Sequence, residues 1–204
     1  AGGIVEQNES ALLDLMASDD PILAAGAARL AGEMEYGPAG PALSELMTHA
    51  DPEVRRTAVA ASGQIGASTV AGGLVQALDD PESDIRQAAA RVLGEMRYHP
   101  AGDTLKSIVT GRRIRSAETS EKIAFFEAFG MLAGEAAVPI LDKLLNGRGF
   151  LGRTEPAEIR ACAALGLGQV GTQAATVSLQ RAVGETDPVI RSAVSRALKG
   201  GQTA

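Results

Sequence analysis

The sequence predicts an all-α protein, an α-solenoid of about six two-helix repeats. Three observations lead to this fold class. The chain repeats itself at intervals of 31 residues, its apolar residues recur at helical spacing, and no segment alternates as a strand would. One pair of short helices cannot bury its own apolar face, so the pairs must stack along the chain.

The repeat is clearest in its glycines. Gly32, Gly63 and Gly94 follow one another at intervals of 31 residues. Residues 32–43 (GEMEYGPAGPAL) match residues 94–105 (GEMRYHPAGDTL) at twice that interval. A unit of this length accommodates two helices of about three turns each and two short connections.

The second helix of each repeat is expected to begin at an Asp-Pro pair. At Asp51-Pro52 and Asp187-Pro188 the aspartate can accept from free N–H groups, and proline fits the first helical position. Asp80-Pro81 has two extra residues before the next arginine, so Ser83 is the alternative cap there. Apolar residues then recur at helical spacing in residues 54–65, 85–96 and 159–170.

Glycines recur near the ends of these second helices, where they would ordinarily lower helix stability. Gly63, Gly94 and Gly168 each cost about 1 kcal/mol in a helix interior. Their recurrence indicates that a neighbouring backbone approaches closely. Gly66 and Gly171 fit the left-handed position that closes a helix.

The first helices are shorter and rich in leucine, and Pro139 lies in an early turn of one of them or kinks it. We expect a single repeat domain over residues 9–200, between tails at residues 1–8 and 201–204. The first helices are expected at residues 11–17, 41–49, 69–78, 103–109, 136–145 and 174–183.

The motif DPxVRxxAxxALGxxG followed by a leucine-rich helix resembles HEAT repeats, in particular the short bacterial HEAT-like repeats of the phycobilisome-lyase type. It reads here as DPEVRRTAVAASGQIG, ESDIRQAAARVLGEM, EPAEIRACAALGLGQVG and DPVIRSAVSRALKG. The first repeat departs from it with Ala24 in place of the arginine, and the fourth has Lys122 and no Asp-Pro pair. The resemblance implies a right-handed superhelix whose second helices line a concave face.

The resemblance also implies a role for the recurring arginine. In HEAT repeats this residue commonly bonds the capping aspartate or a backbone carbonyl of a neighbouring repeat, which builds a ladder. The alternative is a row of cations that face a ligand. The concave-face or ladder residues of this chain are Arg55, Arg86, Lys122, Arg160 and Arg191.

Two segments, residues 110–122 and 146–156, interrupt the regular spacing. Both lie between the two helices of a repeat, so stacking should bring them to one edge, about 10 Å apart. Insertions in repeat proteins often map to the binding face, and arginine binds carboxylate or phosphate through paired bonds. The predicted partner-binding cluster comprises Arg112, Arg113, Arg115, Arg148, Phe150 and Arg153. Solvated loops with Phe150 closing the core are the alternative.

We predict no catalytic, cofactor or metal site. The two histidines, His49 and His99, do not form the His-Glu pairs that HEAT-like di-iron hydroxylases need. Cys162 lies in an apolar helical context typical of a buried hydrophobe. The sequence contains neither a nucleophile elbow nor a phosphate loop.

The charge and the composition of the chain limit the classes of partner that it can bind. The net charge is −6, tryptophan is absent, and ten of the 25 acidic residues but one of the 19 basic residues lie within residues 1–53. Binding to nucleic acid needs many phosphate contacts, so this balance argues against it. No uninterrupted run of apolar residues approaches the eighteen or more of a membrane span.

We therefore expect a cytoplasmic, bacterial protein that is not an enzyme. It should act as a protein–protein interaction scaffold or adaptor, and bind another protein or an acidic peptide through its concave face and inserted loops. No small-molecule substrate is evident. The alternative that the resemblance implies is an accessory subunit similar to the bilin lyases of phycobiliprotein chromophores.

Overall fold

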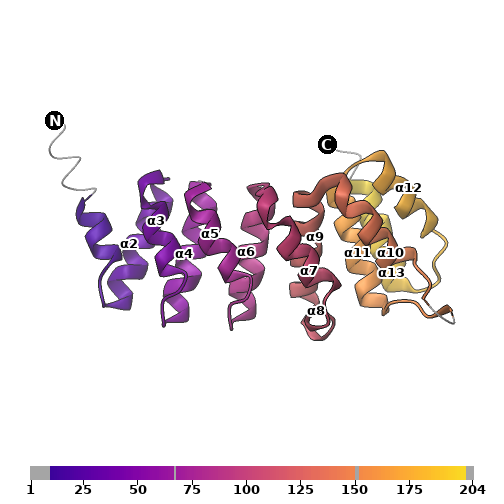
Figure 1. The fold of residues 1–204 in the computed structure, drawn as a ribbon, viewed down its shortest axis with the longest axis horizontal. Coiled ribbons are helices and arrows are strands. Elements are labelled where there is room, and N and C mark those ends of the chain that lie inside the picture. Colours follow the sequence, from indigo (N-terminus) through magenta and orange to yellow (C-terminus); the bar gives the residue numbers. More distant parts are fainter. Residues whose placement is uncertain (1–9, 67, 150–151, 201–204) are drawn as a thin grey trace. The chain divides into compact units, whose positions relative to one another are not determined.

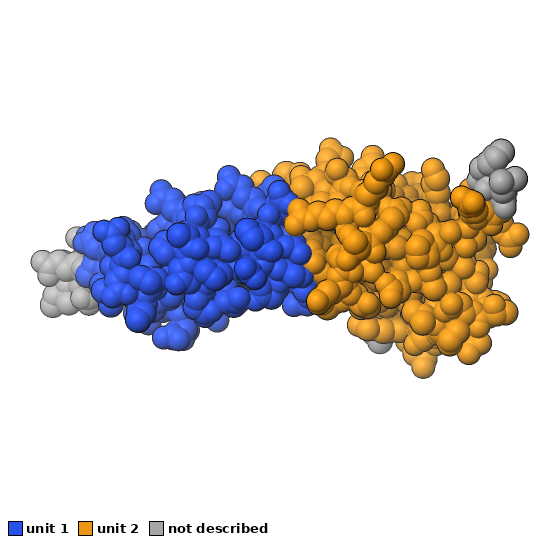
Figure 2. Space-filling view, turned by 90° about the horizontal axis from the view of Figure 1, so that it is seen from below, with its two compact units in different colours: residues 1–96 blue, residues 97–204 orange. Residues whose placement is uncertain are grey.

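The computed structural model describes residues 10–66, 68–149 and 152–200, and this part of the chain contains helices and turns but no strand. The predicted all-α fold is thus confirmed for the described residues. The chain divides into two compact units, residues 1–96 and 97–204 (Figure 2). The expected single domain over residues 9–200 stays a prediction.

In the first unit, second helices stack in chain order (Figure 1). Helix α4 packs against α2 on one side and α6 on the other, while the first helices α3 and α5 pack together. A 3-10 turn leads into each of α3 and α5. The elements are a helix over 10–16, α2 (Pro21–Glu33), η1 (Gly37–Ala39), α3 (Gly40–Leu46), α4 (Pro52–Ile65), η2 (Ser68–Val70), α5 (Ala71–Ala77) and α6 (Ser83–Glu95).

The second unit repeats this arrangement with a larger core. Helix α11 packs between α9 and α13, and the first helices α10 and α12 pack together. An extra four-residue helix, α8, occupies the first inserted segment. The elements are η3 (His99–Ala101), α7 (Gly102–Thr110), α8 (Arg113–Ser116), α9 (Thr119–Ala133), η4 (Gly134–Ala137), α10 (Val138–Asn146), α11 (Ala157–Val170), α12 (Gln173–Arg181) and α13 (Pro188–Gly200).

The segment Thr119–Asn146 is long and apolar enough to match the composition of a membrane span. It is two helices, because Gly134 has a φ of 52° and ends α9 before α10 begins. Phe125, Phe126 and Phe129 of α9 are buried in the core of the second unit. Its apolar character is therefore explained by packing within the protein.

The helix caps follow the sequence prediction with one exception. The carboxylate of Asp51 accepts from the N–H of Glu53 at 2.7 Å, and that of Asp187 accepts from Val189 at 2.8 Å. At α6 the prediction of Ser83 as the cap is wrong, because Ser83 is the first helical residue and Glu82 precedes the helix. The carboxylate of Asp80 instead accepts from the N–H of Glu82 at 2.8 Å.

The helix ends also agree with the predictions. Gly66 and Gly171 follow α4 and α11 with φ values of 64° and 68°, so both have the expected left-handed conformation. Pro139 lies in the first turn of α10 and does not kink it. Each proline or glycine thus lies where the loss of an N–H or a positive φ is tolerated.

Small residues let consecutive second helices approach one another closely. A Cβ atom added to Gly130 of α9 would collide with the carbonyl oxygen of Gly166 in α11, and one on Gly168 would lie 3.0 Å from the Cα atom of Ala197 in α13. The predicted backbone approach is confirmed at Gly168. At Gly63 the close neighbour is a side chain, since the added Cβ would lie 3.0 Å from a methyl group of Val92.

We predict that Gly130→Ala lowers the free energy of unfolding by about 1–3 kcal/mol, because α9 and α11 must move apart to admit the methyl group. Gly26→Ala is the matched control. Its added Cβ would meet no atom within 4 Å, so removal of a mid-helix glycine should raise stability by about 0.5–1 kcal/mol. Urea unfolding followed by circular dichroism measures both. An unchanged midpoint for Gly130→Ala would contradict this close approach.

Candidate functional site

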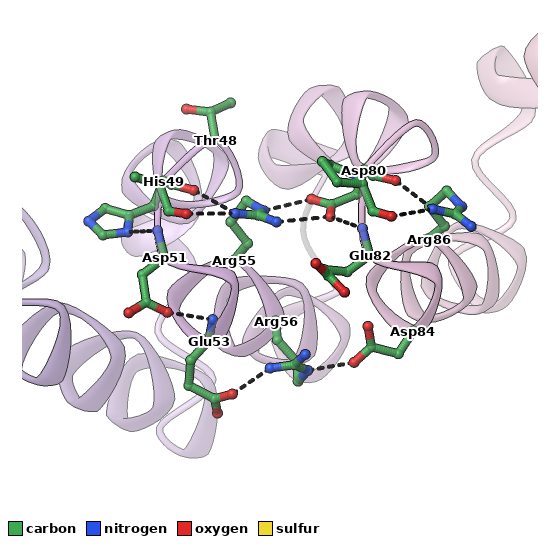
Figure 3. Close-up of polar contacts among 12 residues, drawn as sticks. Thr48, His49, Asp51, Glu53, Arg55, Arg56, Asp80, Glu82, Asp84 and Arg86 are labelled. Atoms are coloured by element: carbon green, nitrogen blue, oxygen red, sulfur yellow. Dashed lines mark hydrogen bonds and ion pairs between the residues drawn. The ribbon is translucent and has the colours of Figure 1, made fainter.

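The recurring arginines of the first unit, Arg55 and Arg86, both form hydrogen bonds to Asp80 (Figure 3). Arg55, in the first turn of α4, donates from Nε and Nη2 to the carboxylate of Asp80 at 2.7 and 3.0 Å. Its Nη1 donates to the carbonyls of His49 and Ala50 at 2.9 and 3.1 Å. The hydrogen bond to Asp80 raises the pKa of Arg55, and both side chains are buried. Arg55 therefore joins the turn before its own helix to the turn of the next repeat.

Arg86 continues this pattern in the next repeat. Its Nη1 donates to the carbonyls of Asp80 and Pro81 at 2.7 and 2.8 Å. Asp80 thus serves two arginines, one through its carboxylate and one through its backbone. These bonds place Arg55 and Arg86 in a structural ladder, which is one of the two roles expected from the sequence.

A second, exposed bridge runs beside the first unit's ladder. Arg56 of α4 donates from Nε to the carboxylate of Asp84 in α6 at 2.6 Å. This hydrogen bond lowers the pKa of Asp84 and raises that of Arg56. The carboxylate therefore stays ionised at neutral pH and keeps the bridge between the two helices.

In the second unit, Arg160 and Lys122 make corresponding bridges. Arg160 donates to the carbonyl of Leu145 at 2.8 Å and to the carboxylate of Glu185, which follows it by 25 residues, the interval that separates Arg55 from Asp80. The Nζ atom of buried Lys122 lies 2.6 Å from the carboxylate of Glu158. Arg191 differs, because it is exposed and forms no ion pair with the described residues.

Arg115 belongs to the same structural pattern, which the sequence did not indicate. It donates to the carbonyls of Thr110 and Gly111, at the end of the preceding helix, and to the carboxylate of Glu155 at 2.8 Å. Arg115 lies in the first inserted segment and Glu155 in the second, so this pair joins the two segments. The prediction that the two segments lie at one edge agrees with this contact. The sequence signal for this role is the position of Arg115, five residues after Thr110 and four after Gly111, whose carbonyls end the preceding helix.

The other members of the predicted cluster are exposed around this pair. Arg112, Arg113, Arg148 and Arg153 all have exposed side chains. Phe150 lies outside the described residues, so its expected contribution has no structural account. The use of these arginines by a partner stays a prediction, while Arg115 is occupied in holding the inserted segments together.

A largely apolar groove crosses the exposed side of the second helices in the second unit. It has a volume of about 460 Å³ and is lined by residues of α9, α11 and α13. Val189, at the start of α13, is 51% exposed at its edge, and Glu158 and Arg196 supply charged groups. The residues that form its apolar surface include Ile123, Ala161, Leu165, Val189 and Ala193.

The first unit has a smaller hollow of about 280 Å³ between α2 and α4. Ile22 lines it and is 80% exposed. Ile22 and Val189 both follow an Asp-Pro pair directly, whereas α4 has Glu53 at the same position. The sequence signal for both hollows is thus an aliphatic residue directly after the Asp-Pro pair.

The larger groove is largely apolar, and the buried Cys162 lies in its lining. Burial raises the pKa of the Cys162 thiol to about 12, so this thiol is protonated at neutral pH. Within the described ranges, no three His, Cys, Asp or Glu side chains gather as metal ligands would. Apolar surface with a few charged groups at its edge is suited to holding aliphatic side chains of a partner.

These features define a class of protein: a stacked α-helical repeat protein with structural arginine bridges. Comparison by sequence agrees, because the family profile described as HEAT repeats matches residues 9–94 and 41–121, together more than half of the chain. The chain therefore belongs to the HEAT-repeat family. No curated protein matches it by sequence.

Solved structures show the same fold at low sequence identity. The complex of CpcE and CpcF of phycocyanin lyase from Nostoc sp. PCC7120 matches with a TM-score of 0.62 and 21% identity, over 90% of this chain and 73% of that one. An engineered protein matches with a TM-score of 0.59 and 20% identity, over 95% and 98% of the two chains. A designed armadillo repeat protein matches with a TM-score of 0.53 and 17% identity, over 93% and 98%.

We predict that Arg55→Ala lowers the free energy of unfolding by about 3–5 kcal/mol, because it leaves the buried carboxylate of Asp80 without its cation. Arg191→Ala removes the arginine at the same motif position of the last repeat, where it is exposed. Its effect should stay within about 0.5 kcal/mol. Chemical unfolding of both variants tests this, and equal losses would show that the Arg55 bridge contributes little.

We predict that Cys162 resists thiol reagents in the folded protein, because the thiol is both buried and protonated. Reaction with a disulfide reagent at pH 8 should be slow and should become complete on addition of denaturant. Absorbance of the released thiolate measures the rate. Rapid reaction without denaturant would show that the groove opens to Cys162.

Proposed function

We propose that this chain is a non-catalytic scaffold that binds another protein through the exposed side of its second helices. The observation that carries the proposal is the groove on α9, α11 and α13, with the half-exposed Val189 at its edge. A concave surface lined mainly by apolar side chains, with a few charged groups at its edge, can hold apolar side chains of a partner. We propose that the scaffold acts in the bacterial cytoplasm, away from a membrane and without a small-molecule substrate.

The arrangement of charge supports binding through apolar contact. Arg55, Arg86 and Arg160 are occupied by carbonyls and carboxylates of the protein itself. They would have to break those bonds to hold a ligand. Full burial of one valine-sized side chain contributes about 1.5 kcal/mol or more, so a few aliphatic contacts in the groove would supply useful affinity.

Polar groups at the groove edge would set the direction of the bound segment. The side chain of Arg196 is 70% exposed and lies 3.8 Å from Glu127, while that of Glu158 is 55% exposed and pairs with Lys122. One cation on α13 and one anion on α11 thus line the groove. A partner segment with aliphatic side chains and a flanking carboxylate near Arg196 fits this pattern.

The second candidate is an accessory subunit of a bilin lyase. The likeness in fold to the CpcE and CpcF complex supports it. Addition of a bilin to the purified protein discriminates between the two, because a bound chromophore would shift its absorbance spectrum. An unchanged spectrum together with capture of an unmodified protein favours the scaffold.

The groove is tested with two matched valine substitutions. Val189→Glu places a charge at the groove, and Val177→Glu places one on α12, at a valine of similar exposure that does not line the groove. In affinity capture from the native host, proteins enriched by the wild type should be lost with Val189→Glu and kept with Val177→Glu. Retention of the same partners by both variants would remove the groove from the binding site.

The inserted segments provide a further arm of the same experiment. Arg113→Glu combined with Arg153→Glu reverses charge at two exposed positions. Loss of the partner with this variant, at unchanged helical circular dichroism, would place the binding site at the inserted segments. Loss only with Val189→Glu would place it in the groove.

A further inference from the structure

A row of exposed apolar side chains runs along α2, the first labelled helix of the chain. Leu23 and Leu30 are each 47% exposed, and Met34, directly after the helix, is 58% exposed. They are separated by seven and four residues, which places them on one side of the helix. We call these three residues the α2 stripe.

The α2 stripe lies on the side of α2 opposite to α4. Gly32 marks the side that faces α4, because an added Cβ there would lie 2.8 Å from the Cα atom of Ala61. Leu23 precedes Gly32 by nine residues, about two and a half turns, so it points the other way. In a stack of repeats this is the side against which another helix packs. Within the described residues, α4 is the only second helix packed on α2.

The last described helix shows what a covered side and a solvent side look like in this protein. Helix α13 packs on α11 through Ala197 and buries Ile190 and Val194. Outside the groove, its exposed positions are mainly polar, namely Arg191, Ser195 and Lys199. A polar outer face is what a terminal repeat needs to stay in water. The α2 stripe lacks that character.

The charged residues near the α2 stripe in sequence are mainly acidic, which favours a basic partner. Five exposed carboxylates lie near it in sequence, whereas Arg29 is the single arginine or lysine within residues 10–53 and stands 4.0 Å from Glu33. A second copy docking through the same face would bring two acidic surfaces together, which charge repulsion opposes. The exposed carboxylates are Asp14, Asp19, Asp20, Glu33 and Glu35.

We propose that the α2 stripe is a docking surface for a basic amphipathic helix of another protein. The apolar side of that helix would cover Leu23, Leu30 and Met34, as α4 covers the other side of α2. Its lysines and arginines would pair with the exposed carboxylates of residues 14–35. This surface is separate from the groove on α9, α11 and α13, and it takes a partner of the opposite charge.

The proposal is tested with a synthetic helix of leucine and lysine, its lysines replaced by glutamate in a second peptide and its order scrambled in a third. Fluorescence anisotropy measures binding to the whole chain at low and high salt. The leucine–lysine helix should bind, weaken with salt, and bind at least about tenfold more tightly than the other two peptides.

Variants locate the binding. The double variant Leu30→Gln with Met34→Gln changes only exposed side chains and should weaken the leucine–lysine helix at least about tenfold. Val177→Gln and the groove variant Val189→Glu should leave its binding unchanged, so that failure here is separable from failure at the groove. Full binding by the double variant overturns the proposal. So does a dimer of the wild type that the double variant abolishes, because the occupant would then be a second copy.

Discussion

The stacking of this protein depends on a buried guanidinium that joins one repeat to the next. Arg55 donates to two carbonyls of its own turn and to the carboxylate of Asp80 in the following repeat. Burial of such a pair is favourable only when nearly all its donors and acceptors are satisfied, and this geometry satisfies them. The bridge holds α4 against the turn that leads into α6, and so helps to fix the register of the apolar contacts between these two helices.

The same bridge explains why the arginine row is a poor candidate for ligand recognition. Arg160 repeats it with Leu145 and Glu185, and Arg115 repeats it between the inserted segments, while Arg86 donates to the carbonyls of its own turn. Each of these cations already has carboxylate or carbonyl partners. The bridges leave open the groove side of the second helices, the α2 stripe and the exposed arginines of the inserted segments.

The fold was predictable because its signals are local and repeated. Asp51, Asp187, Gly66 and Gly171 each act through their own backbone, so spacing in the sequence is enough to place them. Ser83 was misplaced because Asp80, three residues earlier, already takes the N–H of Glu82 and an arginine from another repeat. That competition depends on a contact across 25 residues, which a local pattern does not contain.

The candidate site was less predictable for a related reason. Arg115 was grouped with exposed arginines, because its two acceptor carbonyls and Glu155 come together only when the inserted segments meet. The groove is a property of three helices, and no single segment carries it. Its one local sign was an aliphatic residue directly after an Asp-Pro pair, a position whose exposure emerges only from the stack.

In the Asp-Pro motifs of α2, α4 and α13 the proline starts the helix, and the residue directly after it faces solvent. The residue after the Asp-Pro pair is isoleucine in α2, glutamate in α4 and valine in α13, while the proline before it starts the helix in each case. Ile22 and Val189 project from the surface without contributing to the close contacts between helices. A substitution at this position can thus change the surface of one repeat without changing how the helices pack. The repeats can therefore differ in what they present to solvent while the fold stays the same.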